Sequence, residues 1–173
     1  GGTPSLKNAV IAKFKRDNGL DYNAKQILVS CGGKQSFFNL CQAFINKGDE
    51  VIIPAPYWVS YPDIVIIAEG TPVIVECGIE QGFKLTAAQL SAAITPATKL
   101  VVLNSPSNPT GAVYTLEELA ELGAVLKNYP HILIATDDMY EHVMLGDTKF
   151  FTILNACPEL YNQTIVLNGV SKA

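Results

Sequence analysis

The chain has 173 residues, of which 49% are hydrophobic and 16% charged, so it can supply a sizeable hydrophobic core. Its formal net charge of −4 leaves no basic surface for a polyanion, which disfavours nucleic-acid binding. No apolar run is long enough to span a membrane, and four irregularly spaced cysteines with only two histidines predict reduced thiols in a cytoplasmic protein rather than a metal site.

The first part of the chain predicts a helix, a strand, a glycine-rich turn and a second helix. Apolar residues at helical spacing predict a helix over 4–18, which Gly19 ends. The apolar run in 26–31 predicts a short strand, and the turn Gly32-Gly33-Lys34 precedes a helix over 37–45. Unpaired amide groups at a helix start after such a turn could hold a phosphate. An ordinary tight turn is the alternative.

The next strand, predicted over 51–53, ends in prolines followed by Tyr57 and Trp58. Trp58 is the only tryptophan of the chain. Its indole could stack on a flat ring, or it could be a scaffold residue at the rim of the core. The elements that follow are a helix at 60–68, a strand at 72–76 and a segment at 83–94 that contains a cap-like Thr86 and a helical apolar pattern.

A buried-type strand over 99–103 runs into a stiff loop of turn-forming residues, 104–111. Within this loop Asn108 precedes a proline, which holds its backbone extended and allows its amide to be aimed. The alternative is a loop asparagine that makes only a local turn. Thr115 then predicts the cap of a helix that runs to about residue 128.

A continuous apolar strand predicted over 131–135 leads to two adjacent carboxylates, Asp137 and Asp138. Two such groups cannot both be buried at low cost, so we expect one to face a cleft with a positive partner and the other to be more exposed. A metal site is the rival explanation. After a short helix or turn within 150–160, a strand over 164–167 delivers Lys172, whose amine could form a Schiff base with a carbonyl compound.

Strands that alternate with helices and are apolar throughout predict an α/β domain with a mainly parallel sheet covered on both faces. Ligands of such sheets bind outside the carboxyl ends of the strands. The residues that follow strands at or near this edge are Gly33, Trp58, Asn108, Asp137, Tyr140 and Lys172. Their convergence predicts a functional site there.

Five segments, GGKQSFFNL, PAPYWVSYPD, NSPSNPTG, TDDMYEH and NGVSKA, each resemble a motif of one family, in the family's order and approximate spacing. The chain resembles the central large domain of a class I aminotransferase of the aspartate aminotransferase type, among the fold type I pyridoxal-phosphate enzymes. The resemblance covers nearly all of the chain. It implies a three-layer α/β/α fold and a cofactor-binding large domain over 1–173, which we expect to be incomplete at both ends.

The resemblance implies catalytic roles for three residues. Lys172 would hold pyridoxal phosphate as a Schiff base and later move a proton between the substrate α-carbon and the cofactor. Asp137 would pair with the protonated pyridine nitrogen and keep the ring an electron sink. Tyr140 would donate a hydrogen bond to the phenolic oxygen of the cofactor.

The resemblance also implies binding roles at the other strand ends. Asn108 would contact the same phenolic oxygen and the substrate carboxylate. Trp58 would stack on the pyridine ring and border the substrate. The backbone amides of Gly33 and Lys34 would hold the phosphate at the helix start. No metal is implied.

The activity implied is transfer of an amino group from an amino acid, aspartate or a related one, to a 2-oxo acid such as 2-oxoglutarate, by a homodimer. The family's arginines for the phosphate and the substrate carboxylate are absent from the chain, so we expect the chain alone to be an inactive fragment. A pyridoxal-phosphate lyase on the same fold is the alternative enzyme, and it would not depend on a 2-oxo acid. A nucleotide-binding or purely structural α/β module is the non-enzyme alternative.

Overall fold

The computed structural model describes residues 1–172, and at its centre is a five-stranded sheet with the order β2-β1-β3-β4-β5. All neighbouring strands are parallel, so their carboxyl ends share one edge of the sheet. At that edge Asn104 is paired with Asp137, and Asp137 with Leu167. The strands are β1 (Glu50–Ala55), β2 (Thr71–Glu76), β3 (Thr98–Asn104), β4 (Leu133–Asp137) and β5 (Thr164–Leu167).

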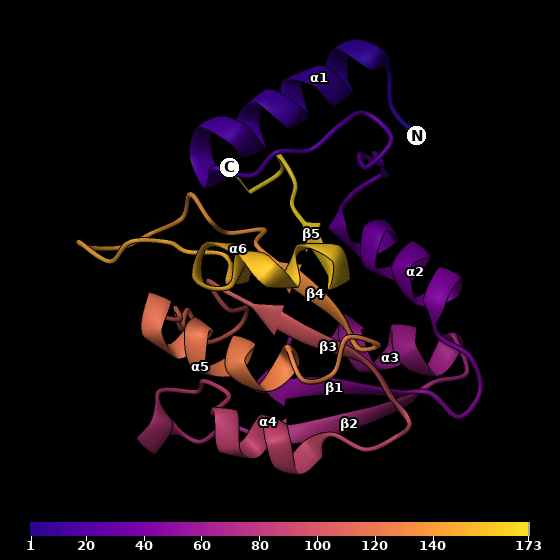
Figure 1. Ribbon diagram of the computed structural model, residues 1–173, viewed down its shortest axis with the longest axis vertical. Coiled ribbons are helices and arrows are strands. Elements are labelled where there is room, and N and C mark those ends of the chain that lie inside the picture. Colours follow the sequence, from indigo (N-terminus) through magenta and orange to yellow (C-terminus); the bar gives the residue numbers. More distant parts are fainter. Residues whose placement is uncertain (173) are drawn as a thin grey trace.

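Successive strand residues point to opposite faces of the sheet, and helices cover both faces. Val51 and Leu100 belong to the core cluster under α2 (Gly33–Phe44) and α3 (Ser60–Ile67), on one face. Ile52 and Val101 belong to the cluster on the other face. That face is covered by α4 (Ala87–Ala93), α5 (Leu116–Leu126) and α6 (Ile153–Ala156) (Figure 1). The predicted three-layer α/β/α fold with a parallel sheet is therefore confirmed.

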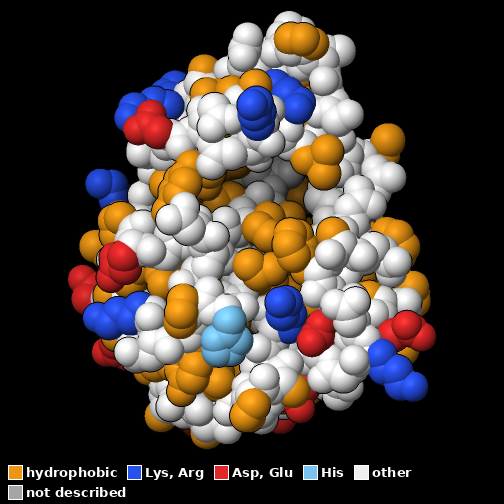
Figure 2. All heavy atoms as spheres, turned by 45° about the vertical axis from the view of Figure 1, so that its right-hand side comes forward, with side chains coloured by type: hydrophobic (Ala, Val, Ile, Leu, Met, Phe, Trp, Pro, Cys, Tyr) orange, Lys and Arg blue, Asp and Glu red, His pale blue; other side chains and the backbone are white. Residues whose placement is uncertain are grey.

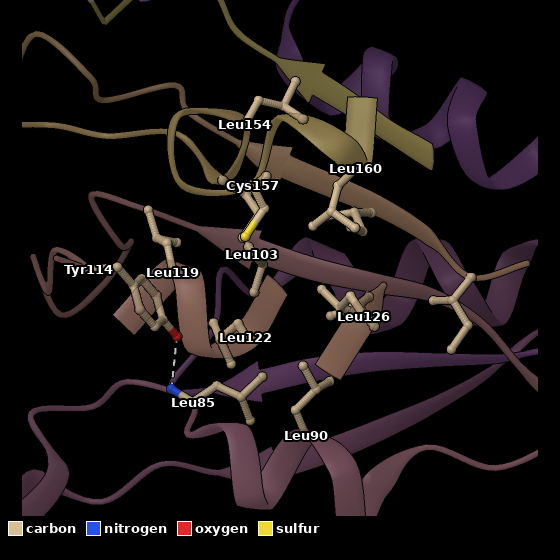
Figure 3. Close-up of a cluster of buried hydrophobic side chains, with 14 of the residues drawn as sticks. Leu85, Leu90, Leu103, Tyr114, Leu119, Leu122, Leu126, Leu154, Cys157 and Leu160 are labelled. Atoms are coloured by element: carbon tan, nitrogen blue, oxygen red, sulfur yellow. Dashed lines mark hydrogen bonds between the residues drawn. The ribbon is translucent and has the colours of Figure 1, made fainter. Parts of the chain in front are cut away.

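The larger core cluster is centred on α5. Leu119, Leu122 and Leu126 of this helix belong to one buried cluster with Leu90 of α4 (Figure 3). The buried Tyr114 closes one end of the cluster, where its hydroxyl accepts a hydrogen bond from the backbone N–H of Leu85 (2.8 Å). A buried phenol thus keeps a polar partner within an otherwise apolar layer.

The predicted helix starts at Thr86 and Thr115 are confirmed. Each threonine forms a capping box, in which its hydroxyl accepts from a backbone N–H of the first turn. The side chain of Gln89 or Glu118 accepts from the threonine N–H in return. These pairs satisfy donors that a helix start leaves unpaired.

Two predictions for the N-terminal part need correction. Residues 26–31 do not form a strand, because the N–H of Val29 bonds to the carbonyl of Gly1 (3.3 Å) and not to a strand. The predicted first helix is divided into α1 (Pro4–Lys13), which has no buried residue, and a π-helical turn η1 (Phe14–Asn18). As predicted, this turn ends at Gly19, which has a φ of 71°. Short 3-10 helices are η2 (Ile79–Gln81) and η3 (Pro158–Gln163).

The surface beside the N-terminal helix is uneven. Figure 2 shows a hollow below this helix that hydrophobic side chains border, with charges of both signs interspersed around it. Among residues 1–172, no helix combines the length and the apolar character needed to cross a bilayer.

Candidate active site

The segments that carry the predicted site residues meet at the carboxyl edge of the sheet. Met139, two residues after β4, lies between the start of α2 and the turn that follows β5. A Cβ atom on Gly33 would collide with the Met139 methyl, and one on Gly169 would lie 2.9 Å from its sulfur. Both glycines therefore allow a close approach. The helix start, the end of β4 and the segment leading to Lys172 are in contact through this one side chain.

Asp137 is the buried carboxylate of this edge, with 8% of its surface exposed. Its Oδ2 accepts a hydrogen bond from the hydroxyl of Tyr61, and its Oδ1 accepts one from the backbone N–H of Met139 (3.3 Å). Burial raises the pKa of Asp137 above its ordinary value, although the two hydrogen bonds oppose this. No lysine, arginine or histidine of residues 1–172 forms an ion pair with it. Its two oxygens keep further lone pairs, so the site suits a cationic N–H donor.

Tyr61, in the first turn of α3, is a site residue that the sequence analysis missed. Its side chain is buried, and burial together with the Asp137 charge raises its pKa well above the usual value. The phenol therefore keeps its proton and acts as a donor to Asp137. One signal could have identified it: it lies three residues after Trp58 at a helix start, and this spacing places side chains on the same face.

Trp58 lies beside Tyr61, with the ring centroids 5.3 Å apart and the rings nearly perpendicular (89°). The ammonium group of Lys34 lies 5.2 Å from the centroid of the indole. Lys34 at the start of α2, Trp58 and Tyr61 therefore lie in a row. Tyr61, at the end of this row, donates to Asp137. An aromatic ring that contacts the hydrogen-bond donor of a buried carboxylate is suited to stack on a flat, positively charged ring.

The start of α2 has the properties of an anion site. Gly32, before the first helical residue, has a φ of 93° and offers no side-chain cap to the helix. Only a residue that tolerates positive φ fits there easily, so this glycine makes the tight entry possible. The amide groups of Gly33 and Lys34 consequently have no side-chain acceptor from the N-cap position. A phosphate group is the kind of ligand that such a helix start binds.

Asn108 is fixed through Asn104, a second residue that the sequence analysis missed. The side-chain oxygen of Asn104 accepts from the backbone N–H of Asn108 (2.7 Å), while its amide donates to the backbone carbonyl of Asp137 (2.9 Å). One side chain therefore ties the loop after β3 to the end of β4. The signal available in the sequence was Asn104 itself, a turn-forming residue at the end of a strand.

The expectation for Asp138 was wrong. It is more deeply buried than Asp137, with only 1% of its surface exposed. Neighbouring residues of the chain point to opposite faces, and both faces are covered here, so neither carboxylate reaches solvent. Thr136 donates to its Oδ1 (2.7 Å), but burial still raises the pKa of Asp138 to about 7. It faces away from the Tyr61 side and does not belong to the site.

The two remaining predicted residues occupy the same edge. Tyr140 is half-buried in the loop after β4 and lies close enough to Tyr61 to contribute to its raised pKa. Lys172 is exposed, and its amine takes part in none of the hydrogen bonds found within residues 1–172. The structure therefore links Gly33, Lys34, Trp58, Asn108, Asp137 and Tyr140 through Met139, Tyr61 and Asn104. Lys172 lies at the end of the adjoining turn after β5.

Known proteins resemble the chain over its whole length. The model of the family described as aminotransferase class I and II matches residues 1–173. The aspartate/prephenate aminotransferase of Nitrosomonas europaea is 66% identical over 173 residues, which are 100% of this chain and 44% of that protein. That of Cereibacter sphaeroides is 57% identical over 99% of the chain and 43% of its own length. The chain therefore spans less than half the length of these relatives.

Solved structures show the same likeness. The aspartate aminotransferase of Rhizobium meliloti superposes with a TM-score of 0.98 at 51% identity, over 99% of this chain and 43% of that one. The aspartate aminotransferase of Thermus thermophilus with maleate has a TM-score of 0.92 at 43% identity, over 99% of this chain and 44% of that one.

Proposed function

Because the chain belongs to the class I and II aminotransferases, we propose that the protein that carries it is a pyridoxal-phosphate-dependent aminotransferase. The proposed reaction moves the amino group of aspartate, or of a related amino acid, to a 2-oxo acid such as 2-oxoglutarate. The names of the relatives support this substrate class, as does maleate, a dicarboxylate, in one similar structure.

The observation that carries the proposal is the state of Asp137. A buried carboxylate whose pKa is raised by burial, and which no basic side chain of residues 1–172 neutralises, is costly without a cation. The protonated ring nitrogen of pyridoxal phosphate is a flat cationic donor that fits this position. The start of α2 is suited to the phosphate of the same molecule, and Trp58 to its ring. The residues present therefore fit the cofactor.

When bound, pyridoxal phosphate supplies an aldehyde that reacts with amines and a ring that withdraws electrons from the substrate. The chain's residues bind and orient. Asp137 stabilises positive charge on the ring nitrogen, and Tyr61 keeps that carboxylate oriented and ionised. Tyr140 and Asn108 are proposed to donate to the phenolic oxygen of the cofactor, and Asn108 also to bind the substrate carboxylate.

Lys172 is proposed to be the base of the reaction. Its amine would attach the cofactor and then move a proton at the α-carbon of the substrate. The turn that carries Lys172 follows β5, which pairs with the strand that carries Asp137, so the two segments lie beside each other at the same edge of the sheet.

The test is covalent trapping in a protein of full family length that contains this chain. After loading with pyridoxal phosphate and reduction with borohydride, peptide mapping should find the pyridoxyl group on Lys172. Lys34 is the internal competitor, because its ammonium group already lies against Trp58. Label on Lys34 would contradict the assignment, and so would label that persists after Lys172→Ala.

A second measurement separates the aminotransferase from the lyase. The proposed enzyme should turn over an amino acid only while a 2-oxo acid is supplied, because the amino group has to leave on an acceptor. Continuous turnover of the amino acid without any 2-oxo acid would favour elimination on the same fold.

A further inference from the structure

Glu141 lies four residues after Asp137 and is a carboxylate that the proposed mechanism does not use. Its side chain is only 3% exposed, yet it accepts hydrogen bonds from three side chains, two in the N-terminal helical segment and one after β5. Its Oε2 accepts from the amide of Asn18 in η1 (2.8 Å). Its Oε1 accepts from the ammonium group of Lys13 in α1 and from the amide of Asn168 (2.7 Å).

The bond to Asn168 reaches the turn that carries Lys172. Asn168 is the first residue after β5, and its side-chain oxygen accepts from the backbone N–H of Gly169 (2.7 Å). One planar amide therefore joins Glu141 at its nitrogen end to the backbone of the turn at its oxygen end. Rotating that amide would break both bonds. The orientation of the turn before Lys172 thus depends on the acceptor that Glu141 provides.

Attachment of the N-terminal helix is the simpler explanation for this buried carboxylate. The helix is also held without Glu141, because the amide of Asn155 in α6 donates to the Asn18 carbonyl (2.8 Å). The side-chain amide of Asn168, in contrast, donates its hydrogen bond to Glu141. Anchoring the helix therefore does not account for the second bond on Oε1.

The charge of the group agrees with this arrangement. Burial alone would raise the pKa of Glu141, but the hydrogen bonds from Asn18, Lys13 and Asn168 outweigh it and hold the pKa below its ordinary value. Glu141 therefore stays ionised, and bonds to an ionised acceptor are stronger than neutral ones. The other titratable groups near it are His142, whose Nε2 lies 3.5 Å from Oε1 of Glu141, Asp17, which is 3.7 Å from the same nitrogen, and Asp138, whose pKa the Glu141 charge helps to raise.

We propose that Glu141 is a positioning residue for Lys172. Through Asn168 it holds the turn over residues 168–172 in the orientation that presents the lysine amine to the strand end carrying Asp137. The inference rests on the proposed function in one respect only, namely that Lys172 is the residue that attaches the cofactor.

The test measures how fast borohydride traps pyridoxal phosphate on Lys172, in a protein of full family length that contains this chain. The variants Glu141→Ala and Asn168→Ala each remove one end of the connection. Asn168→Asp keeps the acceptor for Gly169 but loses the donor to Glu141. Each should slow trapping about tenfold, the scale of a lost hydrogen bond to a charged group. The double variant of Glu141 and Asn168 should be no slower than either single one, because both changes break the same connection.

Asn18→Ala is the matched control, because it removes a donor from the other oxygen of Glu141. It should lower the melting temperature while leaving the trapping rate within about twofold of the wild type, since Asn168 keeps its acceptor.

The outcomes separate this inference from the proposed function. Normal trapping in Glu141→Ala and in both Asn168 variants would overturn the role of Glu141 alone. The role would also be overturned if, in all variants including Asn18→Ala, trapping slowed in proportion to the loss of melting temperature. A wild-type protein with no label on Lys172 would refute both proposals. If Glu141→Ala does not fold, the two variants of the half-buried Asn168 decide the question.

Discussion

Replacing Tyr61 by phenylalanine tests the part of the site that only the structure revealed. The change removes the hydroxyl that donates to Oδ2 of Asp137 and little else. The ring would remain in its edge-to-face contacts with Phe37 and Trp58, whose centroids lie 4.9 and 5.3 Å away. Asp137 would keep only the 3.3 Å bond from the Met139 N–H within residues 1–172.

The size of the effect follows from the charge on the acceptor. A hydrogen bond to a buried ionised group contributes about 1.5–3 kcal/mol, which corresponds to about 10- to 150-fold in an equilibrium or a rate. Without the phenol, burial would raise the pKa of Asp137 further, and its ionised form would be less available to the cofactor ring. We expect kcat/KM to fall about 10- to 100-fold, together with a weaker affinity for pyridoxal phosphate.

Tyr114→Phe is the matched control, because it is the same substitution of a phenol buried on the opposite face of the sheet. It leaves the N–H of Leu85 without its acceptor, so the free energy of unfolding should fall by about 1–3 kcal/mol. Steady-state kinetics, cofactor titration and urea unfolding would be compared for both variants. If Tyr61→Phe affects stability but leaves kinetics and cofactor binding unchanged, Tyr61 is a packing residue and the reasoning fails.

Two further changes probe neighbouring groups. Trp58→Ala should weaken pyridoxal-phosphate binding by roughly 1–3 kcal/mol, and Tyr57→Ala by less; equal affinities in equilibrium dialysis would make Trp58 a scaffold residue. Asp138 has a pKa of about 7 when folded and an ordinary value of 3.8, so its proton stabilises the fold fully below about pH 4, and this contribution is lost as the pH rises toward 7. In Asp138→Asn the free energy of unfolding should therefore decrease less over this pH range, and the difference from the wild type should be at most about 4 kcal/mol. Urea unfolding at several pH values measures this. If the unfolding free energy of the variant depends on pH as strongly as that of the wild type, the argument from burial is wrong.

The elements of the sheet could be predicted because their causes are local. Runs such as 99–103 and 164–167 are apolar throughout and bounded by turn-formers, which is typical of strands buried on both faces. Thr86 and Thr115 stand one residue before helical patterns and cap them, as expected. The segment 26–31 has the same apolar character but no neighbouring strand, because pairing depends on what lies beside it in space.

The placement of the candidate residues was predictable where position along the chain was sufficient. Trp58, Asn108 and Lys172 follow strands and Asp137 ends one, and in a parallel sheet the ends of strands share an edge. The resemblance to a family then suggested the roles that we propose for them. The same reasoning could not tell Asp137 from Asp138 by exposure, since that depends on what covers each face.

The hydrogen-bond partners of these residues were decided by the tertiary structure alone. Tyr61 is 76 positions from Asp137, and Lys13 is 128 positions from Glu141. Whether a buried carboxylate is ionised, and what it orients, depends on the donors that folding brings within about 3 Å of it. The spacing of apolar residues can be recognised in the sequence, whereas contacts between distant segments form only once the sheet and its helices have packed.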